Sequence, residues 1–210
     1  MSSETFRSAF SAAAAAVARR DRVMAKLMKR AGPFRLPRPR TDHFGTLAES
    51  ILYQQLAGAA AAAIHRRFVA LFDGDLSPAA VLALAPRKIR AAGLSGSKVR
   101  SIRDLAAKVA DGTVPLGRIG RLADEEIITR LSVVRGIGRW TAEMFLIFQL
   151  RRLDVWPVDD YGVRKGYSLA YGLPDLLTPK QLQAEGERFR PYRTVAAWYC
   201  WQAVREQRKG

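Results

Sequence analysis

Apolar residues recur at the three- to four-residue spacing of amphipathic helices from His43 to Phe72 of this 210-residue chain. No segment shows the period-two alternation with β-branched residues that is typical of a strand. Helix starts with proline at the first helical position occur three times, at Ser77-Pro78, Ala85-Pro86 and Thr178-Pro179. The sequence therefore predicts an all-α fold of about nine to eleven short helices.

The spacing of helix formers and breakers places these helices. One long helix is expected over about residues 4 to 30, and an extended basic connector with Pro33, Pro37 and Pro39 follows it. Two helices are expected between residues 43 and 72, with Gly58 as the break between them. Later helices are expected over about 97–110, 124–132 and 140–151, and three more after Trp156-Pro157.

The chain carries 35 Lys and Arg against 19 Asp and Glu, a formal charge of +16, and ten of the basic residues lie in the first 41 positions. This excess indicates an anionic partner, with nucleic acid first. The absence of an apolar run of about 18 residues argues against a membrane span. The single cysteine, Cys200, excludes an internal disulfide framework and a four-cysteine zinc or iron–sulfur site, and it favours a reducing cytoplasm.

The stretch from Leu131 to Trp140 is the most informative segment. Gly136 and Gly138 flank one apolar residue between two amphipathic helices, which predicts a tight turn that opens a helix. The first amides of that helix have no intrahelical partner, so they form a site for an anion such as a nucleic-acid phosphate. A plain connection between two helices is the alternative interpretation.

The segment Val134-Arg-Gly-Ile-Gly-Arg-Trp-Thr-Ala142 resembles the helix–hairpin–helix motif of the DNA glycosylase superfamily named after it. Three further segments resemble that family in the same order: Ile51-Leu-Tyr-Gln-Gln-Leu-Ala57, Trp156-Pro-Val-Asp-Asp-Tyr-Gly-Val-Arg-Lys165 and Arg190-Pro-Tyr-Arg-Thr-Val-Ala-Ala-Trp-Tyr-Cys-Trp201. The last of these resembles the final helix of the family's alkylpurine branch, the DNA-3-methyladenine glycosylase II type. The resemblance implies two helical subdomains flanking a cleft. One spans residues 42–152 and ends in the hairpin, and the other combines 1–41 with 153–210.

Asp159 and Asp160 are adjacent carboxylates just where a helix can begin, and either can cap it; for Asp159 we favour the capping role. The resemblance assigns the catalytic acid to Asp160. A carboxylate fixed at the sugar stabilises the oxocarbenium character that develops as the N-glycosidic bond breaks, and it orients or deprotonates a water. A purine alkylated on a ring nitrogen is cationic and leaves readily, so a strong second acid is not required.

The resemblance also implies which residues hold the flipped base. Trp140 and Trp201 stand at aromatic pocket positions, and their alternative role is ordinary core packing. Met144 stands where the branch often has another aromatic, and Tyr53 and Phe44 are weaker pocket candidates. In glycosylase–lyase members a nucleophilic lysine occupies the position of Trp140, so this chain is expected to be a monofunctional glycosylase that leaves an abasic site in base excision repair.

The expected partner is double-stranded DNA with damaged bases, bound by a monomer. Expected DNA contacts are Gly136, Gly138, Arg139 and Thr141 of the hairpin, together with Gln55, which is either a wedge that fills the gap left by the flipped base or a polar helix cap. The resemblance implies a Na⁺ or K⁺ that bridges a phosphate to carbonyls of Ser132, Val134 and Ile137. Further phosphate candidates are Lys98, Arg100, Arg164 and Lys165.

The rival interpretation is a non-catalytic helix–hairpin–helix DNA-binding protein, which would be equally basic and helical but would not need Asp160. A glycosylase for mismatched or oxidised bases is a further alternative. His43 and His65 have no acidic or cysteine neighbours at ligand spacing, so no metal is assigned to them.

Overall fold

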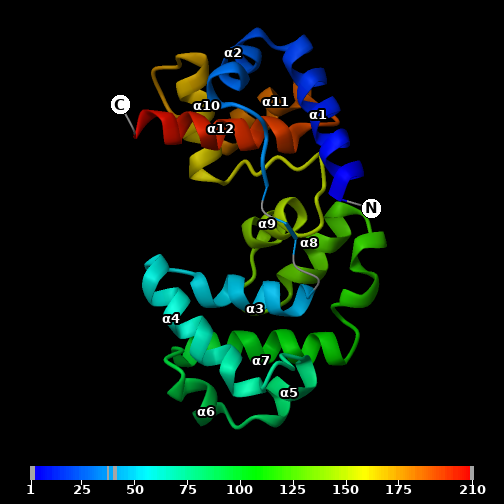
Figure 1. Cartoon of the computed structure of the whole chain (residues 1–210), viewed down its shortest axis with the longest axis vertical. Coiled ribbons are helices and arrows are strands. Elements are labelled where there is room, and N and C mark those ends of the chain that lie inside the picture. The colour runs from blue at the N-terminus through cyan, green and yellow to red at the C-terminus, as the bar shows by residue number, and fades with distance from the viewer. Residues whose placement is uncertain (1–2, 37, 40–41, 209–210) are drawn as a thin grey trace. The chain divides into compact units, whose positions relative to one another are not determined.

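The computed structural model describes residues 3–36, 38–39 and 42–208, and in this part of the chain the secondary structure is entirely helical (Figure 1). The all-α prediction is confirmed. The α-helices, in chain order, are α1 (Ser3–Arg20), α2 (Arg22–Ala31), α3 (His43–Tyr53), α4 (Gly58–Val69), α5 (Pro78–Ala83), α6 (Pro86–Ala91), α7 (Gly96–Ala110), α8 (Asp124–Ser132), α9 (Arg139–Phe148), α10 (Tyr161–Tyr171), α11 (Pro179–Gly186) and α12 (Arg193–Gln207). Three 3₁₀ helices lie between them, η1 (Ala70–Phe72), η2 (Leu116–Arg121) and η3 (Glu187–Phe189).

The chain divides into two compact units, each described here by itself. Unit 1 consists of Met1–Arg38 and Leu146–Gly210, and unit 2 consists of Pro39–Phe145. The sequence-based boundaries, after residues 41 and 152, fall a few residues beyond these. No helix among the described residues is long and apolar enough to cross a membrane.

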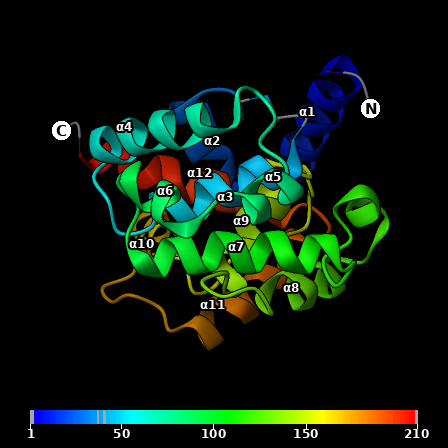
Figure 2. The ribbon, with the colours of Figure 1, turned by 90° about the horizontal axis from the view of Figure 1, so that it is seen from below.

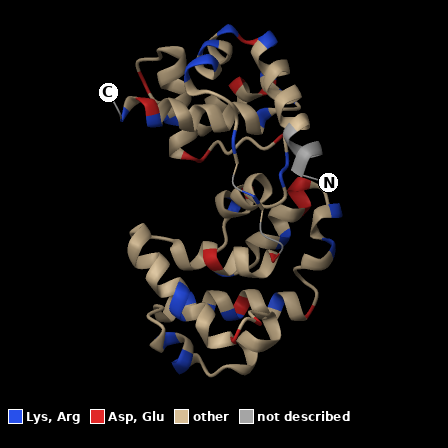
Figure 3. Ribbon diagram, viewed as in Figure 1, with Lys and Arg blue, Asp and Glu red and all other residues tan. Residues whose placement is uncertain are grey.

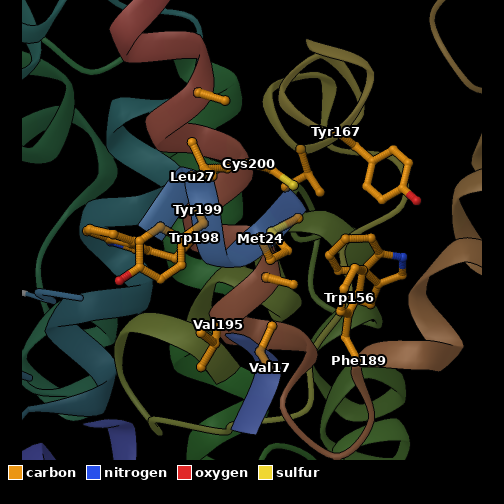
Figure 4. Packing of buried hydrophobic residues seen from close by; sticks show 14 of the residues in the cluster. Val17, Met24, Leu27, Trp156, Tyr167, Phe189, Val195, Trp198, Tyr199 and Cys200 are labelled. Atoms are coloured by element: carbon orange, nitrogen blue, oxygen red, sulfur yellow. The ribbon is translucent and has the colours of Figure 1, made fainter. Parts of the chain in front are cut away.

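Unit 1 is built around α12, which packs against α10, α2 and α1. Its core is rich in aromatic side chains, and Figure 4 shows Met24 and Leu27 of α2 lying beside Tyr199 and Cys200 of α12. The backbones of α10 and α12 are close, since a Cβ atom on Gly166 would lie only 1.8 Å from the carbonyl oxygen of Cys200. Burial, together with the negative charge of Asp160, raises the pKa of the Cys200 thiol, so this cysteine behaves as a core residue.

Unit 2 is built around α7, which packs against α3, α5 and α6 and is seen along its full length in Figure 2. Its inner face is completely buried at Ile102, Leu105 and Ala106. The opposite side of the helix carries charged residues, which gives α7 the one-sided pattern that the sequence predicts.

Two details of the helix prediction are wrong. The expected long N-terminal helix is interrupted at Asp21, because its carboxylate accepts hydrogen bonds at 2.9 Å from the amides of Val23 and Met24 and so starts a new helix, α2. Gly58 begins α4, and the break between α3 and α4 lies just before it, at residues 54–57. Residues 33–36 and 38–39 of the predicted connector are non-helical as expected, whereas Pro37 and Arg40 lie outside the described residues.

Candidate functional site

Asp160 is the N-cap of α10, and its side chain is fixed by two donors. Oδ1 accepts a hydrogen bond from the amide of Val163 at 2.8 Å and another from the indole Nε1 of Trp201 at 2.8 Å. Asp160 is 9% exposed, whereas Asp159 is exposed to solvent. The expectation that Asp159 is the favoured cap is therefore wrong: the capping role falls to the same residue that the resemblance assigns to catalysis.

Trp201 reaches Asp160 because the intervening position on α10 is a glycine. A Cβ atom on Gly162 would lie 2.8 Å from Cδ1 of Trp201 and 3.0 Å from Oδ1 of Asp160. The indole also stacks on Phe148, with ring centroids 5.7 Å apart and planes 23° apart. Gly162 and Phe148, which sequence reasoning missed, thus fix the orientation of the indole against the carboxylate.

The loop that leads to Asp160 is tied to the start of α12. Arg193 donates from Nε to Oδ1 of Asp154 at 2.8 Å and from Nη2 to Oδ2 at 3.0 Å, a two-point ion pair. The hydroxyl of Thr194 accepts from the amide of Val155 at 2.9 Å and lies 2.7 Å from the carbonyl oxygen of Arg152, to which it donates. Sequence reasoning also missed these anchors, although an arginine and a threonine at the start of the last predicted helix were the available signal.

In unit 2 the predicted hairpin joins α8 to α9. Gly136 has a φ of +80°, and a Cβ atom there would lie 2.9 Å from the hydroxyl of Ser101, so both conformation and space require glycine. Gly138 differs, because a Cβ atom on it would meet no protein atom within 4 Å. Ile137, between the two glycines, is only 3% exposed and anchors the turn.

Two polar side chains hold the hairpin from behind. Oδ2 of Asp104 accepts the amide of Arg135 at 2.7 Å, and both carboxylate oxygens accept from Lys108. Burial alone would raise the pKa of Asp104, but the bonds from Arg135 and Lys108 outweigh it and lower that pKa. From α3, the amide Nε2 of Gln54 donates to the carbonyl oxygen of Gly136 at 2.8 Å.

The turn after α3 presents Gln55, whose φ of +55° is unusual for a residue with a side chain. Lys98 supports this turn by donating from Nζ to the carbonyl oxygens of Leu52 at 2.6 Å and Gln54 at 2.8 Å. Burial lowers the pKa of the Lys98 ammonium. Lys98 is therefore engaged with the protein backbone, which argues against its predicted role as a phosphate contact.

The other predicted residues of unit 2 fall into two groups. Trp140 is 46% exposed, and Met144 and Tyr53 are partly buried, whereas Phe44 is 4% exposed and belongs to the core, which favours its alternative packing role. Among the hairpin residues, Ser132 is exposed, the side chain of Thr141 is buried, and Arg139 pairs with Glu125 at 2.6 Å.

The structure thus brings Asp160 and Trp201 together within unit 1, and the hairpin and the Gln55 turn together within unit 2. Among the described residues there is no group of three or more His, Cys, Asp or Glu side chains suited to a metal ion. The two candidate functional features are thus a buried carboxylate at a helix start in unit 1 and an exposed glycine hairpin in unit 2.

Comparison with known proteins agrees with this arrangement. Residues 48–191 match the HhH-GPD superfamily of base excision DNA repair proteins. DNA-3-methyladenine glycosylase 1 of Schizosaccharomyces pombe is 36% identical over 84% of this chain and 79% of its own length. The chain therefore belongs to the HhH-GPD superfamily.

Solved structures show the same fold. A DNA-3-methyladenine glycosidase from Bacillus halodurans superposes with a TM-score of 0.84 at 33% identity, covering 92% of this chain and 89% of that one. The S. pombe 3-methyladenine DNA glycosylase in complex with abasic DNA superposes with a TM-score of 0.76 at 36% identity, covering 86% of this chain and 90% of that one.

Proposed function

We propose that this protein is a monofunctional DNA glycosylase that flips alkylated purines out of duplex DNA and hydrolyses their N-glycosidic bonds, leaving abasic sites for base excision repair in the cytoplasm. Membership of the HhH-GPD superfamily and the names of its relatives support the reaction class. The single observation that carries the proposal is the buried Asp160 carboxylate, held at the start of α10 by the Val163 amide and the Trp201 indole.

In this mechanism Asp160 acts at the sugar. As the bond to the base lengthens, positive charge develops on the deoxyribose, and a carboxylate that is already oriented stabilises it without reorganisation. Asp160 also orients or deprotonates the attacking water. An alkylated purine leaves with its positive charge neutralised, so no strong general acid is needed. Water is the nucleophile, in place of the lysine that glycosylase–lyases have at the position of Trp140.

The aromatic side chains hold the extruded base. We assign stacking to Trp140, which is exposed, and to Trp201, whose indole is kept in place by Asp160 and Phe148. Met144 and Tyr53 of unit 2 are further candidates for contacting the base in this proposal. A ring face attracts the positive charge of an alkylated purine, which gives such a base an advantage over a neutral one.

The hairpin binds the DNA backbone. The open space around Gly138 admits a phosphate close to the first amides of α9, those of Arg139 and Thr141. The carbonyls of Ser132, Val134 and Ile137 suit a Na⁺ or K⁺, since they are neutral oxygens and the Val134 carbonyl, which accepts the Ile137 amide at 3.0 Å, keeps a second lone pair. Such a cation would add positive charge beside the phosphate. Gln55 is the wedge in this proposal.

The test compares Asp160→Asn with Asp159→Asn on methylated duplex DNA, scoring released bases and alkali-labile sites. Both variants lose one negative charge, and asparagine at position 160 retains an oxygen that can accept the bonds from the Val163 amide and the Trp201 indole. We expect Asp159→Asn to match the wild type and Asp160→Asn to lose excision by roughly 10²-fold or more, with DNA binding retained.

A wild-type protein that binds duplex DNA without releasing a base would overturn the proposal in favour of the non-catalytic helix–hairpin–helix protein. Equal loss in the two aspartate variants would show that net charge at the loop matters and that Asp160 has no specific role.

A further inference from the structure

Helix α7 carries three polar residues at three-residue intervals, Lys98, Ser101 and Asp104. Residues at this spacing lie near one face of a helix. The apolar face of the helix is fixed in the core of unit 2, where Ile102 and Leu105 are completely buried. The polar face of α7 is therefore a rigid support for whatever it touches.

Each of the three residues touches a different part of the segments to which we assign DNA contacts. Lys98 donates to the carbonyls of Leu52 and Gln54, immediately before Gln55. Ser101 lies under Gly136, as the 2.9 Å distance from its hydroxyl to a Cβ atom built there shows. Asp104 accepts the amide of Arg135 at 2.7 Å.

The two supported segments are also joined to each other. The side chain of Gln54 spans from the turn to the hairpin, where it donates to the carbonyl of Gly136 at 2.8 Å. Gln55 directly follows, in the left-handed conformation that a side chain adopts only when its surroundings hold it there. Lys98 contributes to these surroundings, because its ammonium group lies at the carbonyls that end α3, where a positive charge is favourable.

We propose that Lys98 and Asp104 are positioning residues that hold the Gln55 turn and the hairpin at one fixed spacing along α7. The distance between Gln55, the proposed wedge, and the hairpin amides proposed to bind a phosphate is then fixed before DNA binds. This inference rests on the proposed glycosylase function. It assigns to Lys98 a role in base flipping that does not involve contact with DNA.

The same helix provides a matched control in Arg103. Its Nη1 donates to the carbonyls of Val81, Leu82 and Leu84 at the end of α5, between 2.9 and 3.3 Å. Arg103 thus makes the same kind of interaction as Lys98, with a helix end to which we assign no DNA contact. Lys98→Met removes two bonds to backbone carbonyls and Arg103→Met removes three, so a purely structural role predicts consequences at least as large for Arg103→Met.

The experiment measures three quantities for the wild type, Lys98→Met, Lys98→Arg, Arg103→Met and Asp104→Ala, at a temperature well below every melting point. The first is affinity for an undamaged duplex. The second is the fluorescence of 2-aminopurine placed opposite a tetrahydrofuran abasic analogue, which reports insertion into the stack. The third is single-turnover release of 7-methylguanine from methylated duplex DNA.

We expect Lys98→Met to reduce the 2-aminopurine response and to slow excision about 10- to 100-fold, as small misplacements of a functional group do. Its affinity for undamaged duplex should match that of Arg103→Met, and Lys98→Arg should restore the response, because a guanidinium can donate to both carbonyls. Asp104→Ala should instead weaken binding to undamaged duplex, since it releases the hairpin amide.

If the wild type excises 7-methylguanine and Lys98→Met behaves as Arg103→Met in all three measurements, the positioning role is wrong while the proposed function stands. If Asp104→Ala leaves affinity for undamaged duplex unchanged, the support of the hairpin by α7 is wrong. A wild type that releases no base instead refutes the proposed function.

Discussion

In unit 1 the candidate catalytic group is a buried side chain, whereas in unit 2 the candidate DNA contacts are exposed stretches of backbone. Asp160 is held by direct contacts between α10 and α12, through the Trp201 indole and the close approach at Gly166. The hairpin and the Gln55 turn are held from behind by charged side chains of α7, Lys98 and Asp104. The proposed function accounts for this difference, because a reacting carboxylate needs a fixed, dry neighbourhood and a phosphate site needs open amides.

The glycines of the two regions illustrate the same contrast. In α10, Gly162 and Gly166 make room for atoms of the protein itself, the Trp201 ring and the Cys200 carbonyl. In the hairpin, the space around Gly138 contains no protein atom within 4 Å, so the room is left for something outside the chain. Substitutions at these two glycines of α10 should therefore disturb packing, and a substitution at Gly138 of the hairpin should disturb binding.

Gly166→Ala should have the largest effect on stability. The added methyl group would lie 1.8 Å from the Cys200 carbonyl oxygen, and backbone at a helix–helix contact cannot give way as a side chain does. We expect a loss of at least about 3 kcal/mol, at the upper end of overpacking costs, measured by urea denaturation. Unfolding at the wild-type denaturant midpoint would show that the α10–α12 contact is looser than the structure indicates.

Gly162→Ala should separate stability from activity. Alanine favours the helix by up to about 1 kcal/mol over glycine, but its methyl group would push the Trp201 indole away from Asp160. We expect near-normal melting, normal affinity for duplex DNA and excision slowed about tenfold or more, because a hydrogen bond to a charged group contributes about 1.5–3 kcal/mol. Normal single-turnover excision by a folded Gly162→Ala protein would show that the indole does not orient the carboxylate.

The sequence was sufficient to predict the features that depend on local pattern. Helical periodicity and proline placement predicted the all-α fold and the starts at Ser77 and Thr178, where the structure shows the expected capping bonds. Local pattern also misled at Asp21, since its surroundings are good helix formers and only the carboxylate's bonds to two amides show the interruption.

The contacts between distant segments were not predictable in this way. Lys98 and the carbonyl of Leu52 are 46 positions apart, and Trp201 and Asp160 are 41 apart, so no spacing rule connects them. Whether Asp160 or Asp159 caps α10 likewise depends on which carboxylate accepts the hydrogen bonds from the Val163 amide and the Trp201 indole. Residue type alone does not predict such contacts, because lysine and aspartate side chains are usually exposed to solvent.

Trp140→Ala tests whether the exposed aromatic of unit 2 serves binding and not packing. Because Trp140 is 46% exposed, its removal should leave the melting temperature nearly unchanged. Stacking of a base on an aromatic ring contributes about 1–3 kcal/mol, so we expect excision of 7-methylguanine to fall roughly tenfold. Trp140→Phe, which keeps a ring face, is the control and should recover most of the activity. A large fall in melting temperature with unchanged excision would assign Trp140 to packing.

The smallest effect concerns the basic face of α2 in unit 1, visible among the Lys and Arg positions in Figure 3. Arg22, Lys26 and Lys29 are exposed on one side of this helix, while Met24 and Leu27 are buried on another. Changing all three to Gln preserves helix propensity and removes three charges. We expect a roughly two- to fivefold loss of affinity for undamaged duplex at low salt, which disappears at high salt, because only long-range attraction is reduced.

The matched control for α2 changes the exposed Arg87, Lys88 and Arg90 of α6, in unit 2, to Gln. If basic residues on both helices act only through the net charge of +16, the two triple variants should lose affinity equally and excise bound substrate at the wild-type rate. A direct phosphate contact has a different signature, because each one lost lowers the slope of log affinity against log salt by about 0.9. A lower slope in the α2 variant alone would show that unit 1 also contacts the DNA backbone, and the contrast between a unit for chemistry and a unit for backbone contacts would then have to be abandoned.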